Sequence, residues 1–244
     1  MVSLSATPGK RPVQLCARVA GVLYLVIIVI GLLSETLIRG RLVVDGDPQA
    51  TAQHIAGAQF LWRLGVAGED LLLICAVVLT LIWYVLLRPV NKTLTQLAIC
   101  FAFMSLAVES VGALHLHAVL TPLLGGAYLA AVDPALLNLI AYQSVIAHAH
   151  AFGLALIFFG VEIVIVGHLI RRSGYFPKAV GTLMQLAGLC YLINSFSMIL
   201  APPLQDRLFP FILLPSLVGE ATFCLWLLIK GIDVQAWERR AGYA

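Results

Sequence analysis

Long apolar stretches alternate with short polar ones along this chain of 244 residues. A helix of about 20 residues crosses the roughly 30 Å of hydrocarbon in a bilayer, and six of the apolar stretches are long enough for this. They fall at roughly 17–38, 65–87, 94–119, 141–170, 179–201 and 209–230. The pattern predicts an all-α polytopic membrane protein, in which a bundle of six transmembrane helices forms one domain over residues 1–244.

A short helix is expected between the first two spans. In the segment DGDPQATAQHIAGAQFLWRLG, Asp47 suits the N-cap and Pro48 suits the first helical position. Ile55, Phe60 and Trp62 then stand among the polar residues Gln53, His54, Gln59 and Arg63. This pattern is typical of an amphipathic helix that lies at the membrane interface.

Two of the six helices are expected to be longer than a span requires. The third runs from Leu94 to about Leu120, and the pair Asp133–Pro134 is a suitable start for a fourth that continues to Arg171. At roughly 1.5 Å per residue the fourth exceeds 50 Å, so it must project, bend or begin as an interfacial segment. All six spans look continuous, except for the glycine-containing region near GLLSE in the first.

Composition supports the membrane class. Hydrophobic residues make up 61% of the chain and charged residues 11%, whereas soluble domains carry about 25% charged residues. The net charge is only +3, and no basic run with interleaved aromatic residues indicates a nucleic-acid partner. The five cysteines lack metal-type spacing and are expected to be small buried hydrophobes. The lipid bilayer is therefore the expected partner, with other membrane subunits or further copies of the chain left open.

The basic residues predict the orientation. If six helices alternate, eleven of the 15 Lys and Arg residues fall on the side of the N-terminus. These are Lys10, Arg11, Arg18, Arg88, Lys92, Arg171, Arg172, Lys178, Lys230, Arg239 and Arg240, and the other side receives Arg39, Arg41, Arg63 and Arg207. By the positive-inside rule both termini are expected to be cytoplasmic.

Several segments together resemble a known family. They are RVAGVLYLVIIVIGLLSE, GDPQATAQHI, LWRLG, YVLLRPVN, FFGVEIVIVGHLIRRSGYFPKAVGTLMQLAGLCYLINSF and SLVGEATFCLWLLIKGIDV. In this order they resemble an uncharacterised bacterial family of six-helix integral membrane proteins, catalogued only as a domain of unknown function. The resemblance implies a bacterial cytoplasmic (inner) membrane location, and it brings no activity, cofactor or catalytic residue. Cys75 departs from the pattern, because the resemblance places an acidic residue in that helix.

A short internal echo accompanies these motifs. AGVLYL at 20–25 returns as AGLCYL at 187–192, and the pair GE occurs at 68–69 and again at 219–220. An ancestral helix-hairpin repeat explains the echo, and so does chance in a chain rich in Ala, Gly and Leu.

Two acidic residues are expected near the membrane midplane. Glu162 lies nine residues before Arg171 and Glu220 lies ten before Lys230, which places each roughly 15 Å from the end of its helix. Such carboxyl groups are costly in hydrocarbon and should face the protein interior. Two interpretations stay open: a proton relay, or structural carboxyls bonded to a Tyr, Asn or Ser such as Asn194 or Ser195.

A polar layer is expected towards the outer interface. It comprises Glu109 in the outer third and, nearer the interface, Glu35, Glu69, Asp70, His115, His117, His148 and His150. One interpretation is ordinary polar helix ends, with Glu69 and Asp70 in a first turn where the helix dipole favours acids. The other is a site for a polar ligand, a cofactor or a transition metal, because zinc, iron and copper sites use His with carboxylates. A haem is disfavoured, since nothing beyond the histidines indicates one.

Helical geometry reduces this set. Residues two apart differ by roughly 200° around the helix axis, so only one histidine of each pair can face a common site. The same arithmetic predicts His117 and His148 as the inward members. It also places Gly153, Gly160 and Gly167 on one flank of the fourth helix, nearly opposite Glu162, so that helix is expected to be buried on both sides.

No catalytic motif decides the function. The chain lacks G-x-S-x-G, a Walker loop, H-E-x-x-H and a lysine in the middle of any span, so an enzyme is not favoured, although a metal-dependent hydrolase or a redox protein stays open. The leading hypothesis is a metal, cofactor or small-ligand site in the extracytoplasmic half. The alternatives are a proton-coupled transporter that uses the midplane carboxylates, and an accessory or structural subunit of a membrane complex.

Overall fold

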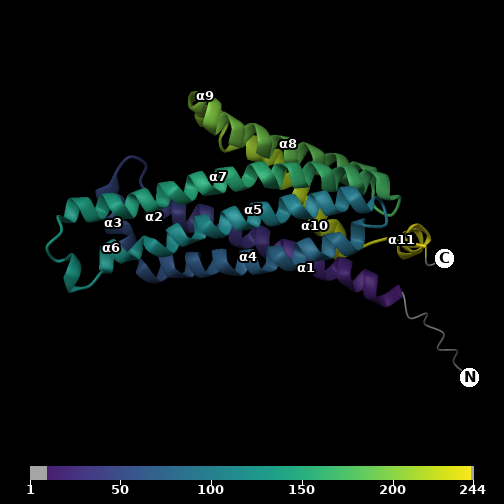
Figure 1. Ribbon diagram of the computed structural model, residues 1–244, viewed down its shortest axis with the longest axis horizontal. Coiled ribbons are helices and arrows are strands. Elements are labelled where there is room, and N and C mark those ends of the chain that lie inside the picture. The colour runs from purple at the N-terminus through teal and green to yellow at the C-terminus, as the bar shows by residue number, and fades with distance from the viewer. Residues whose placement is uncertain (1–9, 243–244) are drawn as a thin grey trace, which may run out of the picture. The chain divides into compact units, whose positions relative to one another are not determined.

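The computed structural model describes residues 10–242, and this part of the chain is helical without any β-strand (Figure 1). The helices are α1 (Lys10–Leu33), the π-helix η1 (Ser34–Arg39), α2 (Gly40–Leu42), α3 (Pro48–Gly57), α4 (Gln59–Leu87), α5 (Lys92–Ala118), α6 (Leu120–Leu124), the 3-10 helix η2 (Ala127–Leu129), α7 (Pro134–Ser173), α8 (Lys178–Leu200), α9 (Pro202–Leu208), the 3-10 helix η3 (Phe211–Leu213), α10 (Leu214–Ile229) and α11 (Val234–Ala241). Within 10–242, six stretches are long and apolar enough to cross a membrane: Pro12–Leu42, Gln59–Leu87, Lys92–Leu124, Pro134–Ser173, Lys178–Leu200 and Phe211–Ile229. The predicted all-α, multi-pass membrane fold is confirmed.

Two helices begin where their capping residues predict. The side chain of Asp47 accepts a hydrogen bond from the backbone N–H of Ala50 (2.9 Å), and Pro48 opens α3. The side chain of Asp133 accepts one from Ala135 (2.9 Å), directly before α7. Helix α7 then continues for 40 residues, which confirms the long fourth helix.

The predicted boundary between the short helix and the second span is wrong. Helix α3 ends at Gly57 and α4 begins at Gln59, six residues earlier than expected, so Phe60 and Trp62 belong to the span. Glu69 consequently lies ten residues inside α4, and the prediction that it and Asp70 occupy a first turn is wrong as well. The polar run around residue 59 led to this wrong boundary. In the structure the chain leaves the helical conformation only at Ala58, between α3 and α4.

The first span contains a π-helical turn that the sequence does not specify. Directly after the GLL of the GLLSE region, residues Ser34–Arg39 form η1, and the N–H of Gly40 donates to the carbonyl of Glu35 five residues earlier. Single π-helical turns inside α-helices are rare and frequently mark functional sites. This turn lies next to the charged residues described below.

Residues in the described part of the chain pack into two compact units. Of the described residues, unit 1 contains 10–25, Ala76–Ser105 and 156–242, and unit 2 contains Val26–Cys75 and Leu106–Ala155. Helices α1, α4, α5 and α7 each contribute residues to both. The assignment of residues 1–244 to one domain stays a prediction, and the two units are described separately.

Close glycine contacts hold α7 and α8 together in unit 1. A Cβ on Gly160 would lie 3.0 Å from the carbonyl oxygen of Gly188, and a Cβ on Gly167 would lie 2.7 Å from that of Gly181. Small residues permit this approach of two backbones, so the predicted packing flank is confirmed at Gly160 and Gly167. Of the six spans, α7 has the largest buried share, 56% against 22–39% for the others.

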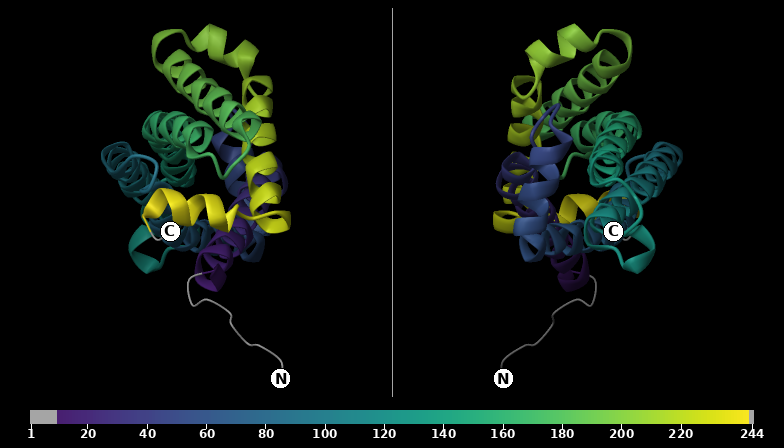
Figure 2. Two further views of the ribbon diagram at one scale, coloured as in Figure 1. Left: turned by 90° about the vertical axis from the view of Figure 1, so that its right-hand side faces the viewer. Right: turned by 90° about the vertical axis from the view of Figure 1, so that its left-hand side faces the viewer.

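Hydrogen bonds connect further helical segments of unit 1. Helices α8 and α10 run side by side and are joined through α9 (Figure 2), and the hydroxyl of Ser216 donates to the carbonyl of Ala187 (3.0 Å). At the end of α4, the carbonyl of Leu86 accepts from the hydroxyl of Tyr175 (2.7 Å) and from the indole N–H of Trp237 in α11 (3.1 Å). Burial raises the pKa of Tyr175, so its phenol stays protonated and can donate.

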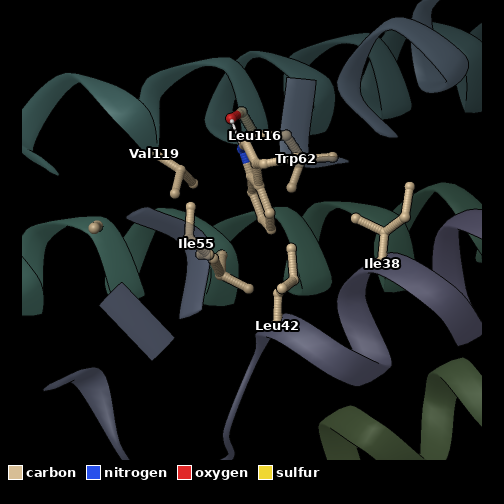
Figure 3. Close-up of a cluster of buried hydrophobic side chains, with 8 residues drawn as sticks. Ile38, Leu42, Ile55, Trp62, Leu116 and Val119 are labelled. Atoms are coloured by element: carbon tan, nitrogen blue, oxygen red, sulfur yellow. Dashed lines mark hydrogen bonds between the residues drawn. The ribbon is translucent and has the colours of Figure 1, made fainter. Parts of the chain in front are cut away.

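Unit 2 has an apolar core around Trp62. The core consists of Ile38, Leu42, Ile55, Trp62, Leu116, Val119, Ala141 and Val145 (Figure 3). The indole N–H of Trp62 donates to the carbonyl of Leu116 (3.2 Å), which satisfies its one polar group. Trp62 is 2% exposed, so it is a core residue of unit 2 and not part of an interfacial helix.

Candidate functional site

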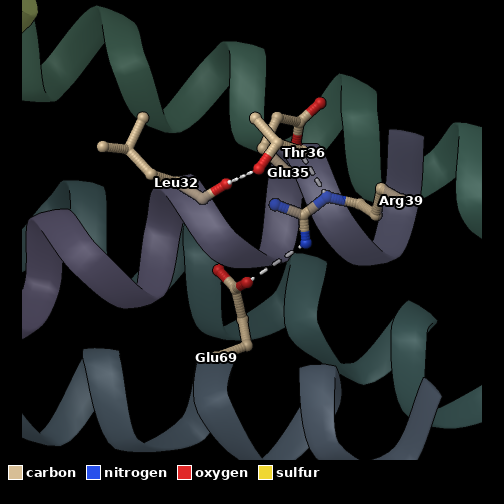
Figure 4. A network of polar contacts seen from close by, with 5 residues as sticks. All are labelled: Leu32, Glu35, Thr36, Arg39 and Glu69. Atoms are coloured by element: carbon tan, nitrogen blue, oxygen red, sulfur yellow. Dashed lines mark hydrogen bonds and ion pairs between the residues drawn. The ribbon is translucent and has the colours of Figure 1, made fainter. Parts of the chain in front are cut away.

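A charged network lies at the π-helical turn of unit 2. The guanidinium of Arg39 binds Glu35 through Nε (2.8 Å) and Glu69 of α4 through Nη1 (3.3 Å), as Figure 4 shows. The Glu69 side chain is 3% exposed, whereas that of Glu35 is 58% exposed. The buried charge of Glu69 is therefore balanced chiefly by Arg39. Sequence reasoning counted Arg39 only as one of four outer basic residues, although its spacing of four from Glu35 is a recognisable pairing signal.

Two further titratable residues of the predicted polar layer are near this network. Glu109 of α5 and His148 of α7 both interact electrostatically with Arg39 and Glu69. His148 is buried, and its Nδ1 makes no well-formed hydrogen bond within residues 10–242. It faces Gly112 of α5, where a Cβ would lie 3.5 Å from Nδ1. The prediction that His148 is the inward member of its pair is confirmed.

A second polar contact of unit 2 lies at the wall of a pocket. The Nε2 atom of His117 lies 3.1 Å from Oδ2 and 3.2 Å from Oδ1 of Asp70, with both side chains about half exposed. The prediction that His117 faces inward like His148 is therefore wrong. The pocket has a volume of about 460 Å³ and is lined by Arg63, Val66, Ala67, Asp70, His117, Leu120, Thr121, Leu124 and Gly125.

The remaining histidines of the layer stand apart from these groups. His115 lines a shallow hollow of about 470 Å³ with Gln143 and Ser144, and His150 is exposed. The opposed burial of His148 and His150 is what a 200° separation requires. Within residues 10–242, no three His, Cys, Asp or Glu side chains are grouped closely enough to hold a metal ion. The transition-metal interpretation of these histidines thus lacks a ligand set and stays a prediction.

The midplane acid Glu220 has a different environment, in unit 1. Tyr24 donates its hydroxyl to Oε2 of Glu220 (2.9 Å), and Tyr191 donates its hydroxyl to Oε1. The carboxyl group is buried. The two phenols are held by aromatic neighbours, Tyr24 edge-on to Trp83 and Tyr191 against Phe159. Each oxygen of this carboxyl group therefore has a neutral donor.

The second midplane acid, Glu162, has no such donors. It is 4% exposed and makes no hydrogen bond with any residue that the structure describes, although it interacts electrostatically with Glu220. Asn194 and Ser195, which were expected as partners of these acids, leave their Oδ1 and Oγ atoms buried without a partner in the described chain. The expectation of a tyrosine partner is thus confirmed for Glu220, and the specific choice of Asn194 or Ser195 is wrong.

A signal for the two tyrosines was present in the sequence. Tyr24 and Tyr191 occupy the same position of the repeated segments AGVLYL and AGLCYL. The two GE pairs of this repeat, however, do not pack against equivalent positions of the preceding helices. A Cβ on Gly219 would approach Leu183 and Ala187 of α8, and Ala187 begins the motif, whereas a Cβ on Gly68 would approach residues 30 and 34, beyond the motif of α1. The hairpins pack in different registers, and only the tyrosines converge.

Comparison with known proteins gives a family without an activity. The profile of a family described as a domain of unknown function (DUF4386) matches residues 19–231. An uncharacterised protein of Archaeoglobus fulgidus is 26% identical over 166 residues, which are 68% of this chain and 83% of that protein. No solved structure matches the chain. Because the profile covers most of the sequence, this chain belongs to the family described as domain of unknown function DUF4386, in agreement with the resemblance seen in its motifs.

Proposed function

We propose that this integral membrane protein binds a small polar ligand in the pocket of unit 2 that Asp70 and His117 line. The observation that carries the proposal is the contact between His117 and Asp70, two residues of the predicted polar layer, at the wall of a pocket of about 460 Å³. Ligand sites are typically concave and mostly apolar, with a few convergent polar groups and a volume of about 300–1,000 Å³. The apolar residues Val66, Leu120 and Leu124 complete such a lining.

The position of the pocket agrees with the extracytoplasmic half expected from the distribution of basic residues. Its residues come from the first turns of α4 and from the end of the Lys92–Leu124 span. The orientation in a bacterial inner membrane, with both termini cytoplasmic, belongs to the same proposal. Its support is the asymmetry of 11 against four basic residues between the two sides of the predicted topology.

Thermal unfolding of the detergent-purified protein against a panel of compounds tests the pocket. Inorganic phosphate, glycerol phosphate, choline, citrate, amino acids and zinc or nickel salts are suitable probes. A compound at 100 times its Kd stabilises the folded state by about 2.7 kcal/mol. This stabilisation should disappear in the Asp70→Asn/His117→Gln double variant and persist in His150→Gln, which alters an exposed histidine of the same unit. Equal responses of the two variants to every compound contradict the proposal.

The metal form of this proposal has its own measurement. Elemental analysis and a visible spectrum of the purified protein should reveal a stoichiometric metal, lost in His117→Ala, if the pocket holds one. A protein without stoichiometric metal and without visible absorption removes that form and leaves the polar ligand.

A second candidate function is proton-coupled transport, favoured by the acids of unit 1. Glu162 and Glu220 are both buried and interact electrostatically. Tyrosine hydroxyls are the described donors to Glu220, and no basic side chain is bonded to either acid within the described residues. Intramembrane carboxyl groups of this kind commonly mark proton pathways. Reconstituted vesicles with an internal pH dye should show proton uptake that falls at least tenfold in Glu162→Gln and Glu220→Gln. Asp206→Asn, at an exposed acid of the same unit, should retain the wild-type rate. Undiminished uptake in both glutamine variants contradicts this candidate.

A further inference from the structure

A basic side chain that has no carboxylate partner among the described residues lines the pocket of unit 2. The carboxylate of Asp70 already has a partner, because Nε2 of His117 lies 3.1 Å from its Oδ2 atom. Arg63 also lines the pocket, is exposed, and makes no ion pair within the described residues. A guanidinium presents a planar fork of donors that matches a carboxylate or a phosphate. The guanidinium of Arg63 is therefore the group of this pocket that suits an anion, while the acidic residue of the pocket is engaged by His117.

The level of Arg63 along its helix indicates which anions are near it. Helix α4 has 29 residues and the Lys92–Leu124 span has 33, whereas about 20 suffice to cross the hydrocarbon. About four or more residues at each end consequently extend into the headgroup region. Arg63 is the fifth residue of α4, and Thr121 is the fourth from the end of the neighbouring span. If the excess is shared equally between the two ends, both residues fall at the border of hydrocarbon and headgroups, from which a long arginine side chain reaches the lipid phosphates.

The other walls of the pocket suit an amphiphile better than a free ion. Beside the polar groups stand Val66, Leu120 and Leu124, so a ligand with an anionic end and an apolar body satisfies both kinds of wall. Leu64 and Phe60, one residue after and three before Arg63, are 55% and 80% exposed and extend the apolar surface on α4. Free inorganic phosphate has no apolar part and would make no favourable contact with these apolar residues.

We infer that the pocket binds the headgroup of an anionic phospholipid, whose phosphate is held by Arg63 and whose glycerol and upper acyl chain lie against Leu120 and Leu124. This inference rests on the proposed function, because it names the ligand class for the same pocket. The contact of His117 with Asp70 has a specific part in it, since the imidazole occupies the carboxylate oxygens of Asp70 that would otherwise face the phosphate.

Native mass spectrometry of the delipidated protein tests the ligand class. The probes are phosphatidylglycerol, phosphatidylcholine, diacylglycerol and inorganic phosphate at equal concentration. The wild type should retain phosphatidylglycerol, with clearly less phosphatidylcholine and no diacylglycerol. Arg63→Gln should lower the phosphatidylglycerol adduct about tenfold, as expected for the loss of a charge-assisted contact. Arg63→Lys should restore part of it, because the charge remains and the fork is lost.

Arg41→Gln is the matched control, because it removes an exposed arginine of the same unit that does not line the pocket. It should keep the adduct within about twofold of the wild type. Equal loss in Arg63→Gln and Arg41→Gln overturns the inference and indicates binding by charge alone. Equal retention of phosphatidylcholine and phosphatidylglycerol, or binding of inorganic phosphate as strong as that of the lipid, overturns it as well.

The outcome also separates this inference from the proposed function. If a compound of the thermal panel requires Asp70 and His117 while lipid binding is indifferent to Arg63, the pocket is a ligand site and the lipid is not its ligand. If neither lipid nor any panel compound depends on Arg63, Asp70 or His117, both the inference and the proposed function fail.

Discussion

The two units of this protein bury a carboxyl group in contrasting ways. In unit 2, Glu69 is 3% exposed and faces the guanidinium of Arg39. In unit 1, Glu220 is 6% exposed and receives two phenolic hydroxyls, from Tyr24 and Tyr191. A cation beside a buried acid supplies a countercharge, whereas two phenols supply hydrogen bonds without any countercharge. Equal burial therefore does not imply an equal role.

This contrast explains why the two candidate functions are assigned to different units. The Arg39 network supports the architecture of unit 2, where the pocket is open and half-exposed groups line it. The acids of unit 1 have no fixed countercharge among their hydrogen-bond partners, which is what a site that gains and loses protons requires.

Replacing the acid should be far more damaging in unit 2 than in unit 1. Glu69→Gln leaves the largely buried Arg39 with the exposed Glu35 alone, and should lower the free energy of unfolding by about 3 kcal/mol. Glu220→Gln retains an oxygen that accepts one phenol, and should cost about 1 kcal/mol. Denaturant titration in mixed micelles measures both. Losses of equal size would show that the partner's charge does not matter.

The glycine contacts of unit 1 should tolerate no added methyl group. A Cβ on Gly188 would lie 2.6 Å from the backbone oxygen of Gly160, so Gly188→Ala should destabilise the protein by about 2 kcal/mol. Gly57 at the end of α3 in unit 2 has open space around the corresponding position. Gly57→Ala should leave stability unchanged or raise it by up to about 1 kcal/mol. The reverse order in micelle unfolding would contradict the close α7–α8 contact.

Removing one phenol from Glu220 should have a moderate effect. Tyr24→Phe deletes a 2.9 Å hydrogen bond to Oε2 and should cost about 1 kcal/mol of stability. Tyr84→Phe serves as the control, because the hydroxyl of Tyr84, also in unit 1, makes no hydrogen bond with the described residues. If the two variants unfold at the same denaturant concentration, the bond to Glu220 adds nothing to stability.

The smallest effect is expected for the ion pair at the pocket. Asp70 and His117 are about half exposed, so Asp70→Asn should change the free energy of unfolding by no more than about 0.5 kcal/mol. A loss as large as that of Glu69→Gln would make the pair a structural element. A negligible loss, combined with lost ligand binding, is the result expected of a functional pair.

The sequence is enough to locate most of the candidate site residues on their helices. It is not enough to predict which partners these residues contact. Counting along helices placed Glu162 and Glu220 together, and both belong to unit 1; it placed the outer layer separately, and those residues all belong to unit 2. The 200° rule separated His148 from His150. The partners escaped the same reasoning, because helix periodicity gives the direction of a side chain on its own helix and not the rotation of the neighbouring helix. That rotation decides which residues of other helices Arg39 and Tyr24 contact, and it decides that His117 is exposed.

Local features of the chain are enough to predict the class of the protein, its six spans, the caps at Asp47 and Asp133, and its family. These follow from local hydrophobicity, from hydrogen bonds within a few residues, and from motifs in a fixed order. Other features are visible only in the folded chain: Ala58 is a brief interruption between two helices, a π-helical turn positions Arg39 between two acids, and two tyrosines 167 residues apart meet on one carboxyl group. Such contacts depend on how helices pack against one another, and the energies of packing arise from surfaces that are not adjacent in the chain.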